Sequence, residues 1–246
     1  MLTQKLLELL RSLRLSGMAD ALERQLTQPA THEGLSFEER LGLLIDAEAT
    51  TRENRRIERL LRAAKLRFSA SVHDINYRHS RGLSKSRMAS LINGNWLHKH
   101  QGLIITGPTG CGKSWLACAL GDNACRQGFS VRYFRASRLF KALEIGRGDG
   151  SYVKQLAQLA RTDLLILDDF ALEPLSARSR NDLLEIMEDR YAERSVLVTS
   201  QLAAKHWHKA IGDPTLADAI LDRIVHNAHR LELKGETMRG SLEAAS

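Results

Sequence analysis

Gly107-Pro108-Thr109-Gly110-Cys111-Gly112-Lys113-Ser114 follows the pattern G-x-x-x-x-G-K-S. In this pattern glycines allow backbone N–H groups to turn inward around a phosphate. The apolar run 102–106 before it predicts a buried parallel strand, and the leucines and alanines after Lys113 predict a helix. That helix would begin with its positive end toward the bound anion. The stretch therefore predicts a phosphate-binding loop between a strand and a helix.

Two side chains of the loop predict what it binds. Lys113 would reach the β- and γ-phosphates of a nucleotide, and Ser114 would give a hydroxyl to Mg²⁺. An apolar run that ends in Asp168-Asp169 follows downstream. Asp168 would hold Mg²⁺ through water, and Asp169 would orient or deprotonate the attacking water. We therefore expect a nucleoside triphosphate and Mg²⁺ at this site, and the resemblance described below implies that the nucleotide is ATP and the protein an ATPase.

The second half of the chain alternates predicted strands with predicted helices, which indicates an α/β fold with a parallel sheet. The expected strands are 102–106, 130–134, 164–168, 195–199 and 229–233. Ligands of such sheets lie at the carboxyl ends of the strands. The loop, the Asp-Asp pair and Thr199 with Ser200 all fall there, so we expect one nucleotide site. Thr199 and Ser200 either contact the γ-phosphate or merely begin a turn.

The first part of the chain lacks strand patterns. We expect an all-helical N-terminal domain at 1–67, a linker at 68–101 and an ATPase domain at 102–240. Leucines at helical spacing predict a first helix, and a second covers about 18–28. Ser36 and Glu39 have the spacing of a capping box that starts a long third helix.

Basic residues line one face of that third helix. The set is Arg52, Arg55, Arg56, Arg59 and Arg62, and residues 52–67 hold seven basic and two acidic side chains, a net of +5 out of +7 for the chain. Such a stripe is either a solvated helix face or a phosphate-binding surface, and its single sign favours DNA.

A second basic set lies at 136–161, where we expect two helical stretches split by residues 146–150. Lys141, Arg147 and Lys154 could contact phosphates there, or could be ordinary solvated side chains. No base-reading motif is present, so binding would be largely independent of sequence.

Composition excludes several classes of protein. The chain of 246 residues is 43% hydrophobic, enough for a globular core, and lacks the long uncharged run of a membrane helix. Charged residues interrupt the first leucines, which argues against a secretory signal. Three cysteines seven residues apart form neither a disulfide framework nor a metal pair. We expect a cytoplasmic protein without a membrane partner.

The order of these motifs, with Leu221-Asp222-Arg223 near the end, resembles an AAA+ ATPase of the helicase-loader and initiator branch, which includes the DnaC and DnaA families. The run 212–223 and Lys234-Gly235-Glu236 look like the IstB family, ATP-binding helpers of insertion-sequence transposition. The resemblance spans nearly the whole chain. It implies the strand order 5-1-4-3-2, and too few residues follow the last strand for the usual C-terminal lid domain.

The resemblance also implies roles for residues. Lys113, Ser114, Asp168 and Asp169 would bind phosphate, bind Mg²⁺ and act on water, with Asp169 in place of the more common glutamate. Residues 199–201 (Thr199, Ser200, Gln201) would include the sensor, and Arg239 is a candidate second sensor. Arg223 matches the arginine finger that is delivered to a neighbouring subunit's nucleotide, or is a surface charge on an amphipathic helix.

The function that the resemblance implies is an ATP-dependent homo-oligomer on duplex DNA that recruits and activates a transposase. The alternative within the same branch is a DnaC-like loader that places a replicative helicase on single-stranded DNA. A metabolic kinase with the same phosphate loop is a third reading, and it would be a monomer indifferent to DNA.

Overall fold

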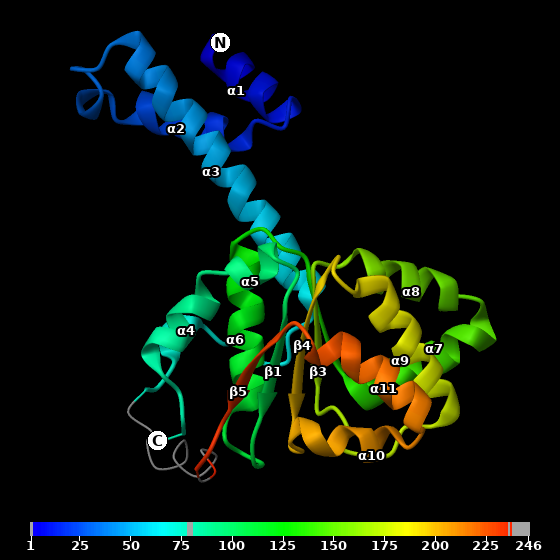
Figure 1. Ribbon diagram of the computed structural model, residues 1–246. Coiled ribbons are helices and arrows are strands. Elements are labelled where there is room, and N and C mark those ends of the chain that lie inside the picture. Colours follow the sequence, from blue (N-terminus) through cyan, green and yellow to red (C-terminus); the bar gives the residue numbers. More distant parts are fainter. Residues whose placement is uncertain (1, 78–80, 236, 238–246) are drawn as a thin grey trace. The chain divides into compact units, whose positions relative to one another are not determined.

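The computed structural model describes residues 2–77, 81–235 and 237. The chain divides into two compact units, Met1–Arg59 and Leu60–Ser246 (Figure 1). In the described part of the chain, no helix combines the length and the apolar character that a membrane span requires. Arg239, the candidate second sensor, lies outside the described residues.

The first unit is helical, as predicted. It contains α1 (Leu2–Ser12), α2 (Ser16–Thr27), η1 (Pro29–Thr31) and most of α3 (Phe37–Ala64). The capping box is confirmed: the Glu39 carboxylate accepts from the Ser36 backbone N–H at 2.7 Å, and Ser36 Oγ accepts from the Glu39 N–H at 3.2 Å. These two bonds satisfy backbone donors that a helix start leaves unpaired, and so fix where α3 begins.

The second unit is built on a five-stranded parallel sheet. Its strands are β1 (Gly102–Thr106), β2 (Val131–Arg135), β3 (Leu164–Asp168), β4 (Ser195–Ser200) and β5 (Ala228–Glu232). Their order across the sheet is β2-β3-β4-β1-β5. Counted from β5, this is the predicted order 5-1-4-3-2, which is therefore confirmed. Each observed strand lies within one residue of its predicted range.

Helices cover both faces of this sheet (Figure 1). Leu103, Ile105 and Ile166 point to the face covered by α6 (Lys113–Arg126), while Ile104 and Leu165 point to the other face. The second face is covered by α7 (Ala136–Asp149), α8 (Tyr152–Arg161), α9 (Ala177–Arg190), α10 (Trp207–Ile211) and α11 (Pro214–Val225). Burial on both faces explains the nearly continuous apolar strands.

Side chains from 68–77 and 81–101 pack into the core on the α6 side. These segments form η2 (Val72–Asp74), α4 (Lys85–Ile92) and α5 (Asn95–His98), and they bury Met88 and Trp96 against that core. The Trp96 indole N–H donates to the Leu91 carbonyl at 3.0 Å, which satisfies its buried polar atom.

One prediction about local structure is wrong. The expected break at 146–150 is narrower, because α7 continues through Gly146 and Gly148 and ends at Asp149, with Gly150 in the left-handed conformation. Gly146 is buried, and a Cβ there would lie 2.6 Å from the Gln155 amide nitrogen of α8. Gly146 therefore allows α7 and α8 to pack closely and does not interrupt α7.

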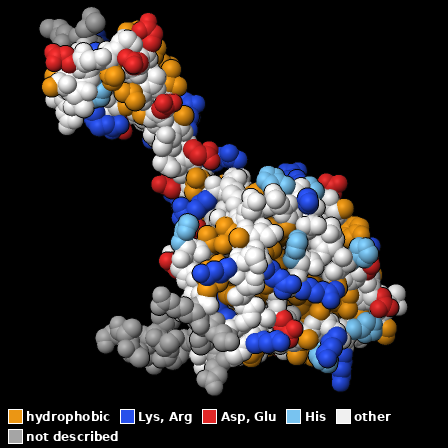
Figure 2. All heavy atoms as spheres, turned by 60° about the vertical axis from the view of Figure 1, so that its left-hand side comes forward, with side chains coloured by type: hydrophobic (Ala, Val, Ile, Leu, Met, Phe, Trp, Pro, Cys, Tyr) orange, Lys and Arg blue, Asp and Glu red, His pale blue; other side chains and the backbone are white. Residues whose placement is uncertain are grey.

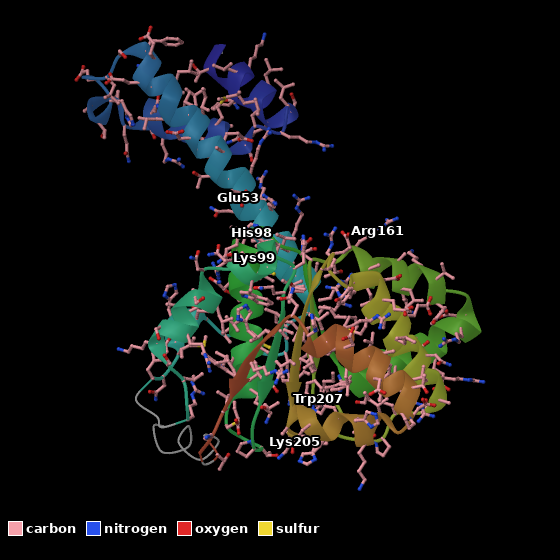
Figure 3. The ribbon with its side chains drawn as sticks, viewed as in Figure 1. Glu53, His98, Lys99, Arg161, Lys205 and Trp207 are labelled. Carbon is pink, nitrogen blue, oxygen red and sulfur yellow. The ribbon has the colours of Figure 1, made fainter. Side chains whose placement is uncertain are left out.

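Figure 3 labels residues at the amino ends and at the carboxyl ends of the parallel strands. His98 and Lys99, before β1, and Arg161, before β3, lie near the amino ends of the strands, whereas Lys205 and Trp207 follow β4 at the carboxyl ends. Lys205 lies in η3 (Ala204–His206). Trp207 is fully buried, donates to the Leu202 carbonyl at 3.0 Å and packs edge-on against the ring of Phe170. Trp207 thereby joins the segments that follow β3 and β4.

Candidate functional site

The predicted phosphate loop connects β1 to α6. Gly107 has φ 151° and Gly110 has φ 84°, conformations that favour glycine. A Cβ on Gly107 would lie 2.4 Å from the Leu233 carbonyl oxygen, and one on Gly110 would lie 2.2 Å from the Thr237 hydroxyl. Only residues without a side chain fit at these two positions, so the glycines determine the shape of the loop.

The Lys113 ammonium group lies inside the loop. Its Nζ donates to the carbonyl oxygens of Gly107 and Pro108 at 2.8 and 2.7 Å, and its side chain is buried. The hydroxyl of Thr109 donates to Gln201 Oε1 at 2.8 Å. The loop is therefore tied to the end of β4 by one bond, and its lysine is held where it can meet a phosphate.

Asp168, the last residue of β3, is fully buried and is surrounded by hydroxyl groups. Its Oδ1 accepts from Ser114 Oγ at 2.7 Å and from Thr199 Oγ1 at 2.5 Å, and its Oδ2 accepts from the Tyr133 hydroxyl at 2.6 Å. Burial first, and then the bond to Asp168, raise the pKa of Tyr133. Tyr133 therefore stays a neutral donor.

Asp169 turns in the left-handed conformation with φ 55°. Its backbone N–H donates to Thr199 Oγ1 at 3.1 Å, and its Oδ2 accepts from Arg135 Nη2 at 2.9 Å and from Arg135 Nε at 3.2 Å. The bond to Asp169 raises the pKa of Arg135. Thr199 thus bridges the two carboxylate residues that the sequence predicted to act together.

A cavity of about 470 Å³ opens beside these groups. Lys113, Ser114, Asp169 and Gln201 line it, together with the aromatic residues Phe68 and Trp115. This volume is within the usual range for small-molecule sites, and aromatic walls beside convergent polar groups are typical of them. The three sensor candidates differ in their contacts. The Thr199 hydroxyl donates to Asp168, and the Ser200 hydroxyl donates to the Phe170 carbonyl. Of the three, only Gln201 lines the cavity.

The residues present fit Mg²⁺ bound together with a phosphate. Ser114 Oγ and Asp168 Oδ1 lie 2.7 Å apart, and both are the hard oxygen ligands that Mg²⁺ prefers. In such sites Mg²⁺ is bound by one or two protein oxygens, and phosphate and water oxygens supply the other ligands. Among the described residues no group of three or more His, Cys, Asp or Glu side chains could hold a metal alone.

Arg223 is not brought to this cavity. It lies on α11, where its guanidinium donates to the Ala219 carbonyl at 2.7 Å and to Glu188 Oε1 at 3.0 Å. It lines a second cavity of about 300 Å³ together with Gly102 and Val196. Those two residues lie in the amino-terminal parts of β1 and β4, whereas Asp168 ends β3, so Arg223 is at the opposite end of the strands from Asp168.

The predicted DNA-binding residues differ in how much of their charge is already paired. Arg52 donates to the buried Glu48 at 2.7 Å and lowers the pKa of that carboxyl. Arg147 on α7 donates both terminal nitrogens to the buried Asp182 and stacks on Tyr152. Arg147 is thus part of an internal ion pair that joins α7 to α9.

The remaining predicted DNA contacts are exposed. Arg56 lies 3.7 Å from Glu53, a loose pair on the helix surface. Arg55, Arg59, Lys141 and Lys154 have no ion pair within the part of the chain that the structure describes. Exposed cations of this kind are the ones that can neutralise phosphates at little cost.

Three residues of the site were missed by the sequence analysis: Arg67, Tyr133 and Arg135. Tyr133 and Arg135 lie on β2, whose neighbour in the sheet is β3 with Asp168 at its end. The strand order together with the alternation of side chains could have identified them. Arg67 carries no comparable signal, because it follows the end of α3 and belongs to no motif.

Comparison with protein families decides the identity. The model of the family described as IstB-like ATP binding protein matches residues 8–245. The chain belongs to this family. The predicted family resemblance is confirmed.

Relatives at high identity carry names of the same kind. An insertion-sequence ATP-binding protein of Sinorhizobium fredii is 50% identical over 239 residues, covering 97% of each chain. One from the insertion sequence IS1162 of Pseudomonas fluorescens is 51% identical over 203 residues, covering 82% of this chain and 87% of its own. One of Mycobacterium tuberculosis is 32% identical, covering 94% and 92%.

Solved structures support the fold. The DnaC helicase loader aligns with TM-score 0.55 and 23% identity over 70% of this chain and all of that chain. DnaI aligns with TM-score 0.58 and 19% identity over 72% and 93%. The IstB-like chain therefore has the AAA+ fold of DnaC and its relatives, which confirms the predicted fold class.

The loop geometry generates a first prediction. Gly107→Ala forces a Cβ against the Leu233 carbonyl at a backbone angle that alanine avoids, so nucleotide affinity should fall at least tenfold. Fluorescence anisotropy of a labelled ATP analogue measures this. The matched control is Gly148→Ala, because no atom lies within 4 Å of the added Cβ and alanine suits a helix. Unchanged affinity in Gly107→Ala would contradict the role of the loop.

Proposed function

We propose that this IstB-like protein is an ATP-dependent DNA-binding ATPase that oligomerises on duplex DNA and helps to recruit and activate a transposase. One observation carries the proposal: the carboxylates and the phosphate loop lie at one edge of the sheet, and Arg223 lies at the other. Arg223 cannot reach its own chain's loop. A second copy that places its Arg223 edge against that loop would complete the site.

In the proposed mechanism, Lys113 binds the β- and γ-phosphates, and Ser114 and Asp168 hold Mg²⁺, which neutralises charge on the phosphates when bound. Asp169 accepts the proton of the attacking water through Oδ1, because Arg135 occupies its Oδ2. Gln201 accepts a hydrogen bond from Thr109 of the loop and would respond to the γ-phosphate. Phe68 and Trp115 provide aromatic surface for the base.

Arg223 of a neighbouring subunit would stabilise the charge that develops in the transition state. Glu188 and the Ala219 carbonyl orient the guanidinium toward the surface cavity at the amino ends of the strands. Hydrolysis then depends on assembly, because each site needs two copies.

Duplex DNA would be bound through its backbone by exposed cations. Arg55 and Arg59 on α3 and Lys141 and Lys154 on the α7–α8 pair are the residues that support this proposal. Arg147 is left out, because Asp182 already neutralises it. Arg52 is shared with Glu48 and contributes less.

The N-terminal unit also carries exposed apolar side chains, which support the proposal that it binds protein partners. Figure 2 shows such side chains gathered on this unit, and they include Leu9, Leu13, Phe37 and Ile45, each at least half exposed. Exposed apolar side chains gathered on one unit are typical of interaction sites. We propose that a second copy of the chain or the transposase binds these side chains. We also propose that the protein acts in the cytoplasm.

The function predicts nucleotide-dependent assembly. Wild-type protein with duplex DNA and Mg-ATP should sediment as an oligomer on DNA, and omission of ATP or the change Lys113→Ala should leave small particles. Analytical ultracentrifugation with labelled DNA measures both. Assembly that ignores ATP and Lys113 would remove the mechanism. Clear preference for single-stranded DNA would favour the helicase-loader function instead.

The shared site predicts complementation between inactive variants. Arg223→Ala and Asp169→Asn should each lose at least tenfold in DNA-stimulated ATPase, because each lacks one half of the site. In a mixture, some interfaces pair the intact Asp169 of one variant with the intact Arg223 of the other. Phosphate release should then exceed the sum of the two separate rates. A mixture that is no more active than its components would place both residues in one chain's site.

The basic stripe predicts a change in salt dependence. The affinity for duplex DNA should fall as salt rises. Because Arg55→Gln/Arg59→Gln removes two proposed phosphate contacts, the plot of log affinity against log salt should become less steep by about two. The control is Arg147→Gln, which should lower thermal stability through the lost Asp182 pair and leave the slope unchanged. An unaltered slope in the double variant would make the stripe an ordinary solvated face.

A further inference from the structure

Asp168 is a buried carboxylate whose hydrogen bonds do not neutralise it. All three donors, from Ser114, Thr199 and Tyr133, are uncharged hydroxyls. A fully buried carboxylate is costly unless a positive charge lies nearby. Asp168 therefore needs a cation, and the hydroxyls alone do not supply one.

Within the described residues, the one ion pair of Asp168 is with Arg67, whose Nη1 lies 3.8 Å from Asp168 Oδ2. The other cations of the site have different partners. Lys113 donates to loop carbonyls, and Arg135 donates to Asp169. Arg81, which also lines the cavity, donates to the Cys111 carbonyl at 3.4 Å. Arg67 is thus the charge that offsets Asp168 in this structure.

Arg67 occupies a position from which it can withdraw. Its side chain is 38% exposed, it stacks on the ring of Phe68 at 4.9 Å, and it lines the 470 Å³ cavity. The distance to Oδ2 exceeds that of a hydrogen bond, so Arg67 is joined to Asp168 by charge alone. The guanidinium can move toward solvent in the cavity and leave the three hydroxyls in place.

We propose that Arg67 is the counter-ion of Asp168 that competes with the divalent cation, so that it sets how strongly nucleotide binding depends on Mg²⁺. This inference rests on the proposed nucleotide site and deepens it. Two cations against one carboxylate repel each other, so Arg67 gives up Asp168 when Mg²⁺ is bound there. While Arg67 holds the carboxylate, Ser114 and Thr199 remain aligned on Oδ1.

The test compares nucleotide affinity with and without the metal. The Kd of a fluorescent ATP analogue is measured in excess Mg²⁺ and in EDTA, for wild type and for Arg67→Gln. The Kd in EDTA divided by the Kd in Mg²⁺ gives the factor by which Mg²⁺ strengthens nucleotide binding. In Arg67→Gln, Asp168 has lost the cation that competes with Mg²⁺, so Mg²⁺ should strengthen nucleotide binding more than it does in wild type. The ratio should rise about tenfold in Arg67→Gln, equivalent to about 1.4 kcal/mol.

Two further variants make the result specific. Arg126→Gln removes an exposed arginine that pairs with Asp122 on α6 and does not line the cavity, so its ratio should equal that of wild type. In an Asp168→Asn background, Arg67→Gln should no longer change the ratio, because the carboxylate for which the two cations compete is absent. A ratio that is unchanged by Arg67→Gln, or raised equally in Asp168→Asn, overturns the proposal.

Two outcomes separate this inference from the proposed function. If Arg67→Gln does not fold, Arg67→Lys is measured in the same way; a smaller rise is expected, and no rise overturns the proposal. If wild-type protein binds the ATP analogue in neither condition, the nucleotide site itself fails. If wild type binds and assembles on DNA while the ratio is insensitive to Arg67, only the present inference fails.

Discussion

The structure depends on one buried carboxylate. Asp168 ends β3 with no exposure to solvent, and it is held by hydroxyls from α6, β2 and β4. Since a desolvated charge tolerates little displacement of its donors, these bonds fix the ends of three elements relative to the phosphate loop. The same requirement for charge explains why a cation stands beside it. Folding stability and the proposed binding of Mg²⁺ thus depend on the same carboxylate oxygens.

The parallel sheet separates the parts of the proposed reaction. All strands run the same way, so the loop and both aspartates gather at the carboxyl edge, while α11 returns to the amino edge before β5 begins. Arg223 lies in the last turn of α11 and is therefore directed away from its own chain's cavity. Chain connectivity alone thus keeps Arg223 away from its own chain's loop, as the proposed sharing of the site between copies requires.

Positive charge in the sequence is a poor guide to free positive charge on the surface. Arg147 and Arg52 looked equivalent to their neighbours, yet each has a buried acidic partner, Asp182 and Glu48. Such pairs form because folding brings together residues that are distant in sequence, or because a helix places side chains four residues apart on one face. The smaller set that remains, with Arg55 and Arg59, is the set on which the proposed DNA binding depends.

The sequence by itself determined the phosphate loop, the Asp168-Asp169 pair, the five strands and the capping box, because each depends on residues that are near one another along the chain. The strand order came from the family resemblance, since hydrophobic periodicity says nothing about which strands are neighbours. Only the tertiary structure decided that Tyr133 and Arg135 hold the two carboxylates and that Arg67 faces Asp168. It also decided that Gly146 continues a helix. These contacts join segments far apart in sequence, and their energies come from burial and close approach, which no local pattern records.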